Sequence, residues 1–259
     1  MRLCRFEHGG RISIGVWEGE RVLVCRGDML GGFERTSATL SADKVCLLAP
    51  LVPGKIIGIG RNYADHAREL GNVPPEAEPL IFLKPSSSII ASGDRILLPP
   101  SSQRVDHEGE LGVVIGRMGR SIGEDEDPLR YVFGYSCVND VTARDLQKKD
   151  VQFTRAKGFD TFCPFGPWIE TELEPSHLGI QTRVNGRIRQ SGNTGDMLFP
   201  VARLVRFLSG IMTLYPGDLI ATGTPAGVGP LADGDLVEVE IEGIGILKNP
   251  VIGSYRKSI

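Results

Sequence analysis

Residues 107–116 read HEGELGVVIG, and residues 135–140 read YSCVND. Each run has the apolar pattern of a buried β-strand and carries acidic residues at one end. Glu108 and Glu110 are two residues apart, and a strand points residues i and i+2 toward the same face. Two neighbouring carboxylates at such a buried edge are costly unless a cation neutralises them. Asp140 supplies a third acid at the end of the second run.

The three carboxylates indicate a metal site made only of oxygen ligands. Mg²⁺ and Mn²⁺ prefer such ligands, and three protein carboxylates leave about three octahedral positions open for water or substrate. The alternative is three solvent-facing acids at strand ends, which share no role. The residues favour the metal site, with Glu108, Glu110 and Asp140 as its ligands.

The composition is that of an ordinary globular protein. Hydrophobic residues make up 41% of the 259 residues, and the formal net charge of −3 argues against a nucleic-acid partner. The sequence contains no run of 18 apolar residues, which a membrane-spanning helix would need. Its first residues lack the apolar core of a signal peptide. The five cysteines form no C-x-x-C pair, which favours a reducing compartment. We therefore expect a cytoplasmic protein that acts on a small molecule, with neither nucleic acid nor membrane as a partner.

Strand patterns dominate the chain. Residues 11–25 and 236–252 alternate in the manner of β-hairpins, and Asn185-Gly186 is the signal of a type I′ hairpin turn. The 33 glycines and 17 prolines are typical of a turn-rich β architecture. We predict a β-rich α+β fold, with a small N-terminal β subdomain over residues 1–53 and a larger catalytic domain over residues 54–259.

The helices are expected to be short. Residues 61–71 contain one helix, and residues 141–150 contain a second. The clearest helix covers residues 200–209, where apolar residues recur every three to four positions and Gly210 is the expected end.

The short helix over residues 61–71 carries a possible catalytic pair. His66 and Glu69 lie three residues apart, so their side chains share one face of the helix. A carboxylate beside an imidazole fixes its tautomer and raises its basicity, which suits a pair that activates water or moves a proton. The alternative is an ordinary surface ion pair. Lys157 is a candidate cation for a developing enolate or carboxylate, with a solvated surface lysine as the alternative.

A glycine-rich loop follows a later strand. Residues 221–230 read ATGTPAGVGP. The loop is not a P-loop, because no Gly-Lys-Ser/Thr follows. Its backbone amides and the hydroxyl of Thr224 can form a small anion nest for a carboxylate, and a plain tight turn is the alternative.

Seven motifs together resemble the fumarylacetoacetate hydrolase superfamily. In the family's order, they are GIGRNYADHARELG, PLIFLKPSSSI, DHEGELGVVIG, GYSCVNDVTARDLQ, AKGFDTFCPFGP, VNGRIRQSGNT and GDLIATGTPAGVGP. Several motifs in one order are far more specific than any one of them. Only about fifty residues precede them, so the chain resembles the short bacterial members, such as 2-hydroxyhepta-2,4-diene-1,7-dioate isomerase, and acylpyruvate hydrolase. Eukaryotic fumarylacetoacetase has a longer N-terminal domain.

The resemblance implies a rolled set of mixed β-sheets that holds Mg²⁺ or Mn²⁺ on the three carboxylates. It implies that His66 and Glu69 form a catalytic dyad on a short lid helix and that Lys157 lies beside the metal. It also implies a pocket that binds the substrate, with Thr224 at the substrate carboxylate. The predicted substrate-binding residues are Arg61, Tyr63, Arg144, Gln147, Gly223 and Thr224.

The implied activity is that of a divalent-metal-dependent enzyme for small 2-oxo or 2-hydroxy-enoic acids and diacids. Three outcomes share an enolate that the metal stabilises: C–C bond hydrolysis as with acylpyruvates, decarboxylation as with oxaloacetate, and isomerisation of 2-hydroxyhepta-2,4-diene-1,7-dioate in aromatic compound catabolism. The resemblance also implies a homodimer. The rival hypothesis is a non-catalytic metal-dependent binder of small carboxylates on the same fold. The presence of both His66 and Glu69 weighs against that rival.

Overall fold

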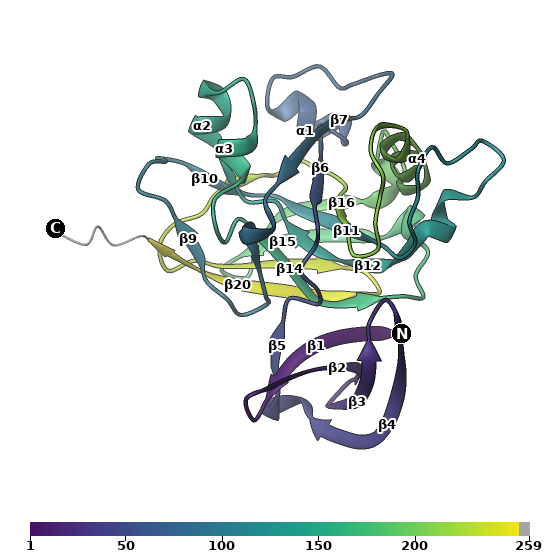
Figure 1. Ribbon diagram of the computed structural model, residues 1–259. Helices are drawn as coiled ribbons and strands as arrows, with labels where there is room; N and C mark the ends of the chain where they lie inside the picture. The colour runs from purple at the N-terminus through teal and green to yellow at the C-terminus, as the bar shows by residue number, and fades with distance from the viewer. Residues whose placement is uncertain (254–259) are drawn as a thin grey trace.

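Three β-sheets and four short α-helices build the chain over residues 1–253, which are the residues that the computed structural model describes (Figure 1). Residues 254–259 of the predicted larger domain lie outside the described residues. The helices are α1 (Ala64–Glu69), α2 (Arg144–Lys149), α3 (Thr154–Lys157) and α4 (Val201–Ile211). Most strand pairs are antiparallel, but some are parallel, so the sheets are mixed. These findings confirm the predicted β-rich α+β fold with short helices.

The largest sheet has twelve strands. Its path is β4 (Gly32–Ser41), β3 (Arg21–Asp28), β2 (Arg11–Glu18), β1 (Arg2–His8), β14 (Cys163–Glu170), β12 (Val132–Asn139), β11 (Gly109–Ile115), β17 (Leu219–Ala221), β6 (Ile56–Gly60) and β7 (Leu80–Lys84), with β5 (Cys46–Leu48) on β1 and β8 (Ile89–Ile90) on β14. The N-terminal strands therefore join the rest of the chain through β1 and β14, where Leu3 pairs with Ile169. The stacked rings of Trp17 and Trp168 lie 5.1 Å apart at this junction. The subdomain boundary at residue 53 stays a prediction.

Two smaller sheets complete the fold. One has the order β16 (Arg187–Asn193), β15 (Gly179–Val184), β19 (Leu236–Ile241), β20 (Gly245–Gly253) and β9 (Ile96–Leu98), and the other has the order β13 (Thr142–Ala143), β10 (Val105–His107) and β18 (Gly229–Pro230). All three predicted hairpins are present as β2–β3, β15–β16 and β19–β20. Asn185 and Gly186 have φ angles of 52° and 74°, and a type I′ turn requires positive φ at both positions.

The main hydrophobic core lies between the twelve-stranded and the five-stranded sheets. Leu111 and Val113 of β11 contribute to one side, and Val239 and Ile241 of β19 contribute to the other, each at most 1% exposed. The apolar stripe of α4 packs against the same core. Burial of this stripe, rather than intrinsic helix stability, keeps such a short helix folded.

All three predicted helices differ from their predicted bounds, and α1 covers only residues 64–69 of the predicted 61–71. Gly210 lies inside the last turn of α4, because the backbone N–H of Met212 closes that turn on the carbonyl of Leu208 at 2.9 Å. The second predicted helix begins only at Arg144, since Thr142 and Ala143 first form β13. Packing of the preceding residues into a sheet takes precedence over local helix preference there.

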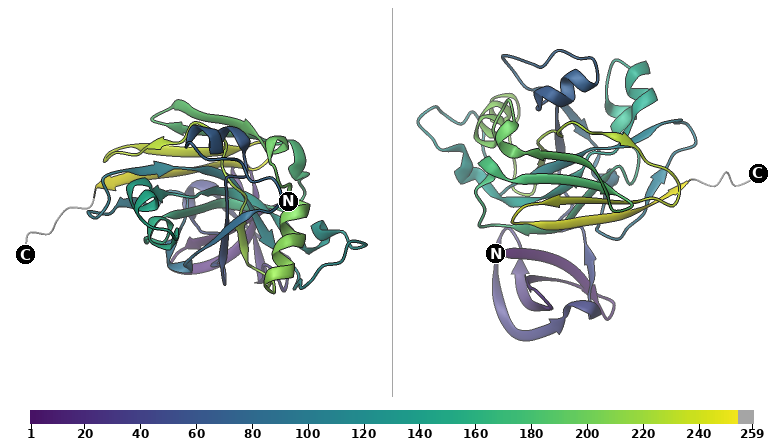
Figure 2. Two further views of the ribbon diagram at one scale, coloured as in Figure 1. Left: turned by 90° about the horizontal axis from the view of Figure 1, so that it is seen from above. Right: turned by 180° about the vertical axis from the view of Figure 1, so that it is seen from behind.

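Helices α1, α2 and α3 lie at the end of the molecule opposite strands β1–β4 (Figures 1 and 2). Helix α1 has only six residues, and Asn62 fastens the chain just before it. The Asn62 amide donates to the carbonyl of Thr222 at 2.7 Å, and its oxygen accepts from the backbone N–H of Phe199 at 2.8 Å. None of the helices formed by residues 1–253 is long and apolar enough to span a membrane.

Candidate active site

A cavity of about 430 Å³ opens at the end of the fold that carries α1, α2 and α3. Nine of the predicted site residues line it: Arg61, His66, Glu69, Glu108, Glu110, Arg144, Gln147, Lys157 and Thr224. Asp140 and Gly223 do not line the cavity but bond to residues that do. Tyr63 belongs to the hydrophobic core, where its hydroxyl is buried without a hydrogen-bond partner in the described chain.

The three predicted metal ligands meet at one point. Each of Glu108, Glu110 and Asp140 offers an oxygen atom that lies within 4.8 Å of the other two, and all three side chains are buried. Two backbone contacts hold their segments together. The N–H of Glu108 donates to the side chain of Asn139 at 2.9 Å, and the N–H of Asp140 donates to the carbonyl of Glu108 at 2.8 Å.

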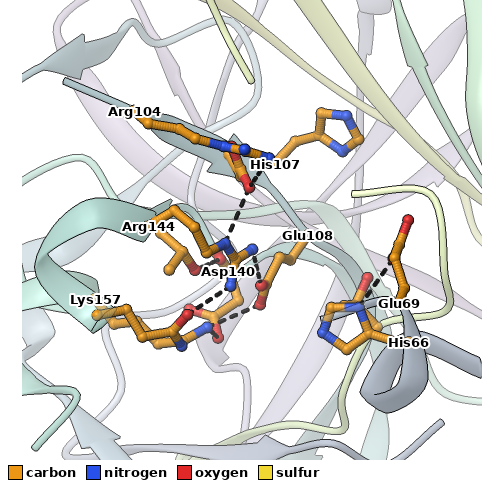
Figure 3. Close-up of polar contacts among 12 residues, drawn as sticks. His66, Glu69, Arg104, His107, Glu108, Asp140, Arg144 and Lys157 are labelled. Atoms are coloured by element: carbon orange, nitrogen blue, oxygen red, sulfur yellow. Dashed lines mark hydrogen bonds and ion pairs between the residues drawn. The ribbon is translucent and has the colours of Figure 1, made fainter. Parts of the chain in front are cut away.

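Two of these carboxylates already have cationic partners. The Lys157 ammonium bonds to both Glu108, at 2.8 Å, and Asp140, while Lys84 donates to Asp140 at 2.6 Å. Arg144 donates to Glu108 and to Asp106 (Figure 3). Burial alone would raise the pKa of Glu108, but Lys157 and Arg144 outweigh it and hold that pKa well below the usual range.

Glu110 differs from its two neighbours, because no ion pair within residues 1–253 includes it. Its carboxylate accepts one hydrogen bond, from the backbone N–H of Gly223 at 2.8 Å. Burial, followed by the nearby charge of Asp140, raises the pKa of Glu110 well above its ordinary value. A buried carboxylate that has no ion-pair partner within residues 1–253, beside two further carboxylates, fits a divalent cation.

His66 faces this cluster from α1. Its imidazole and Glu69 lie on one side of the Glu108 carboxylate, and Lys157 and Arg144 lie on the other (Figure 3). Burial lowers the pKa of His66 below 6.5, so the ring is neutral at neutral pH and can accept a proton. Its Nδ1 lies 3.5 Å from Glu69 without forming a hydrogen bond, and both oxygens of Glu69 accept from the backbone N–H of Gly227 at 3.1 Å.

The glycine-rich loop supports the site from behind. A Cβ atom on Gly223 would lie 2.7 Å from the Cβ of Asn62, and its φ of 97° also favours glycine. The Thr224 hydroxyl donates to the carbonyl of Gly109 at 2.8 Å and accepts from Gln190 at 2.6 Å. Its one donor is therefore already used in a hydrogen bond within the protein. Its role at a substrate carboxylate stays a prediction. The oxygen of Gln147 accepts from Arg144 at 2.7 Å.

Four residues of this network were missed by the sequence analysis: Asn62, Lys84, Asp106 and Gln190. Lys84 left a signal, because a lysine that ends an apolar strand needs a buried partner or an exit to solvent. Its side chain is fully buried against Asp140. The other three are ordinary polar residues whose partners are distant in the sequence, and no local pattern marks them.

The chain matches two family models. The model described as the fumarylacetoacetate hydrolase C-terminal domain matches residues 55–252, and the Rv2993c-like N-terminal model matches residues 1–50.

Individual relatives cover most of the chain. An uncharacterized protein of Archaeoglobus fulgidus is 54% identical over 250 residues, which are 96% of each chain. The mitochondrial oxaloacetate tautomerase FAHD2A of Bos taurus is 45% identical over 226 residues, which are 82% of this chain and 71% of that one. The crystal structure of 5-carboxymethyl-2-hydroxymuconate delta-isomerase from Mycobacterium smegmatis has a TM-score of 0.90 at 44% identity, and the match covers 98% of this chain and 100% of that chain.

Proposed function

The chain belongs to the fumarylacetoacetate hydrolase family, and on that premise we propose that it is a Mg²⁺- or Mn²⁺-dependent enzyme that moves a proton on small 2-oxo acids. The reaction is a keto–enol tautomerisation or the shift of a double bond. One observation carries the proposal: the buried carboxylate of Glu110, which has no ion-pair partner within residues 1–253, and the neutral imidazole of His66 line the same cavity. The names of the relatives, an oxaloacetate tautomerase and a muconate isomerase, support the same class of reaction.

The metal would be held by Glu108, Glu110 and Asp140. When bound, it supplies a Lewis acid that polarises a substrate carbonyl and stabilises the negative charge of an enolate. The positive charge of the metal would also give Glu110 the cationic partner that it does not have within residues 1–253. Lys157 already pairs with both Glu108 and Asp140, and Arg144 pairs with Glu108, so these cations hold the two carboxylates in place.

Side chains of the cavity would transfer the proton and bind the substrate. His66 removes a proton from the carbon next to the 2-oxo group and returns it at the other end of the enolate. Arg61 and the exposed Lys148 add positive charge to the cavity wall, and neither enters an ion pair within residues 1–253. Two free cations on the wall favour substrates that carry a second carboxylate.

Hydrolysis of a C–C bond is the second candidate, because Glu69 lies 3.5 Å from His66 and a small closure would complete a water-activating pair. Decarboxylation of oxaloacetate would need the same enolate without an attacking water. The non-catalytic binder is not favoured, because the named relatives are enzymes.

A panel of 2-oxo acids tests the proposal. Protein stripped of metal with EDTA is expected to be inactive, and Mg²⁺ or Mn²⁺ is expected to restore turnover. Loss of the enol absorbance of oxaloacetate reports tautomerisation, and pyruvate release from acetylpyruvate reports hydrolysis. We expect tautomerisation of oxaloacetate, the diacid, to be faster than hydrolysis of acetylpyruvate. Metal-dependent binding of the panel without any turnover would instead favour the binder.

We also propose that the protein forms a homodimer, since two-fold dimers are the commonest assemblies of soluble oligomers. Light scattering at micromolar concentration is expected to give twice the chain mass of 28.1 kDa. A mass of one chain under these conditions would contradict this expectation.

A further inference from the structure

Gln190 of β16 is fully buried, and its amide is saturated with hydrogen bonds to two different segments. Its oxygen accepts from the backbone N–H of Gly109 at 3.0 Å and lies 3.2 Å from Nδ1 of His107. Its nitrogen donates to the hydroxyl of Thr224 at 2.6 Å and to the carbonyl of Pro225 at 2.7 Å. A glutamine amide offers two donors and one acceptor oxygen, so no donor is left for a substrate.

The first segment that Gln190 holds is the ligand segment, residues 107–110. Gly109 lies between Glu108 and Glu110, so its position sets where both carboxylates point. The second segment is the glycine-rich loop, residues 221–230, through its residues Thr224 and Pro225. The two segments also contact each other, because the Thr224 hydroxyl donates to the carbonyl of Gly109 at 2.8 Å.

The glycine-rich loop in turn contacts both halves of the site. The N–H of Gly223 donates to Glu110 at 2.8 Å, and the N–H of Gly227 donates to Glu69 at 3.1 Å. A displacement of the loop would therefore move a proposed metal ligand and the carboxylate beside His66 at the same time.

Both segments pack closely against the β15–β16 hairpin. A Cβ atom on Gly109 would lie 2.1 Å from the hydroxyl of Thr182 on β15. A Cβ atom on Gly227 would lie 2.1 Å from the carbonyl of Arg189, next to Gln190. Both segments therefore pack closely against this hairpin, and the glycines permit that close approach.

We propose that Gln190 is a positioning residue that fixes the ligand segment and the glycine-rich loop relative to each other, and so sets the affinity of the site for its divalent cation. The inference rests on the proposed function, because it assumes that Glu108 and Glu110 bind that cation. Gln190 does not line the cavity, so its effect passes through Gly109 and Thr224. Substitution of residues that orient metal ligands in this way commonly lowers metal affinity about 10–100-fold.

The test compares the full-length, metal-free protein with Gln190→Leu and Gln190→Glu. Gln181→Leu is the matched control, because Gln181 lies on the neighbouring strand β15 and its amide oxygen accepts from Arg183 at 2.7 Å instead. Calorimetric titration with Mn²⁺ is expected to show binding weakened roughly 10–100-fold in both Gln190 variants and unchanged in the control. Hydrogen exchange at the amides of Gly223 and Gly227 is expected to be faster in the Gln190 variants.

Unchanged Mn²⁺ affinity in a folded Gln190 variant would overturn the inference. If Gln190→Leu does not fold, Gln190→Glu decides, because it preserves the size and one acceptor oxygen but loses both donors. If the wild-type protein itself does not bind Mn²⁺, the proposed function fails. The exchange rates at Gly223 and Gly227 then decide separately whether Gln190 holds the loop.

Discussion

Glu110→Gln is expected to reduce metal-dependent turnover about 100-fold or more while making the metal-free protein more stable than wild type. The loss of turnover follows because a proposed ligand loses its charge. The gain in stability follows because Glu110 is buried without an ion-pair partner within residues 1–253, so its ionised form is costly without metal. Turnover with Mg²⁺, and thermal unfolding in EDTA at neutral pH, measure the two effects.

Glu108→Gln provides the contrast, since Glu108 accepts from both Arg144 and Lys157. Removing its charge is expected to lower turnover similarly but to cost the metal-free protein roughly 3–5 kcal/mol, as breaking a buried ion pair does. Opposite stability changes with a shared loss of activity would indicate that both carboxylates bind the metal, but that only Glu108 is paired with cations in the metal-free protein. Wild-type turnover in Glu110→Gln would remove Glu110 from the ligand set. Equal destabilisation by both substitutions would contradict the charge assignment.

The meeting of the three acids follows from patterns that the sequence displays. Strand alternation predicts that Glu108 and Glu110 share a face, and the apolar run before Asp140 predicts that Asp140 ends a strand. In the structure Glu108 lies just before β11 and Glu110 lies within it. The register confirms this geometry, because Gly109 pairs with Asn139, next to Asp140. Periodicity is a local property, so it is readable without knowing how the chain folds.

The cations and anchors of the site depend on non-local packing. Lys84 reaches Asp140 across 56 positions of sequence, and Gln190 reaches Gly109 across 81. Such partners become neighbours only after the sheets assemble. The same reason explains the junction of β1 with β14, because the hairpin pattern of residues 11–25 contains no information on which distant strand will extend the sheet.

His66→Ala is expected to lower the rate of proton transfer about 10²–10⁴-fold, which is the usual contribution of a positioned acid–base group. Binding of oxalate to the Mg²⁺-loaded protein is expected to stay close to that of wild type, since the chelating carboxylates do not need the imidazole. Arg68→Ala is the matched control, because Arg68 lies on the same helix and pairs with Asp65 on the exposed side. Steady-state kinetics and calorimetry with oxalate measure the two quantities.

The pH profile separates a catalytic role of His66 from a structural one. Burial lowers the pKa of His66 below 6.5, and a bound divalent cation would lower it further by repulsion. A base is active when unprotonated, so kcat/KM in the wild type is expected to be level at neutral pH and to fall as the pH drops through that lowered pKa. His66→Ala should lack this acid limb, whereas Arg68→Ala should retain it. If His66→Ala kept wild-type turnover, His66 would not be the base, and the assignment of the proton transfer to its imidazole would be wrong.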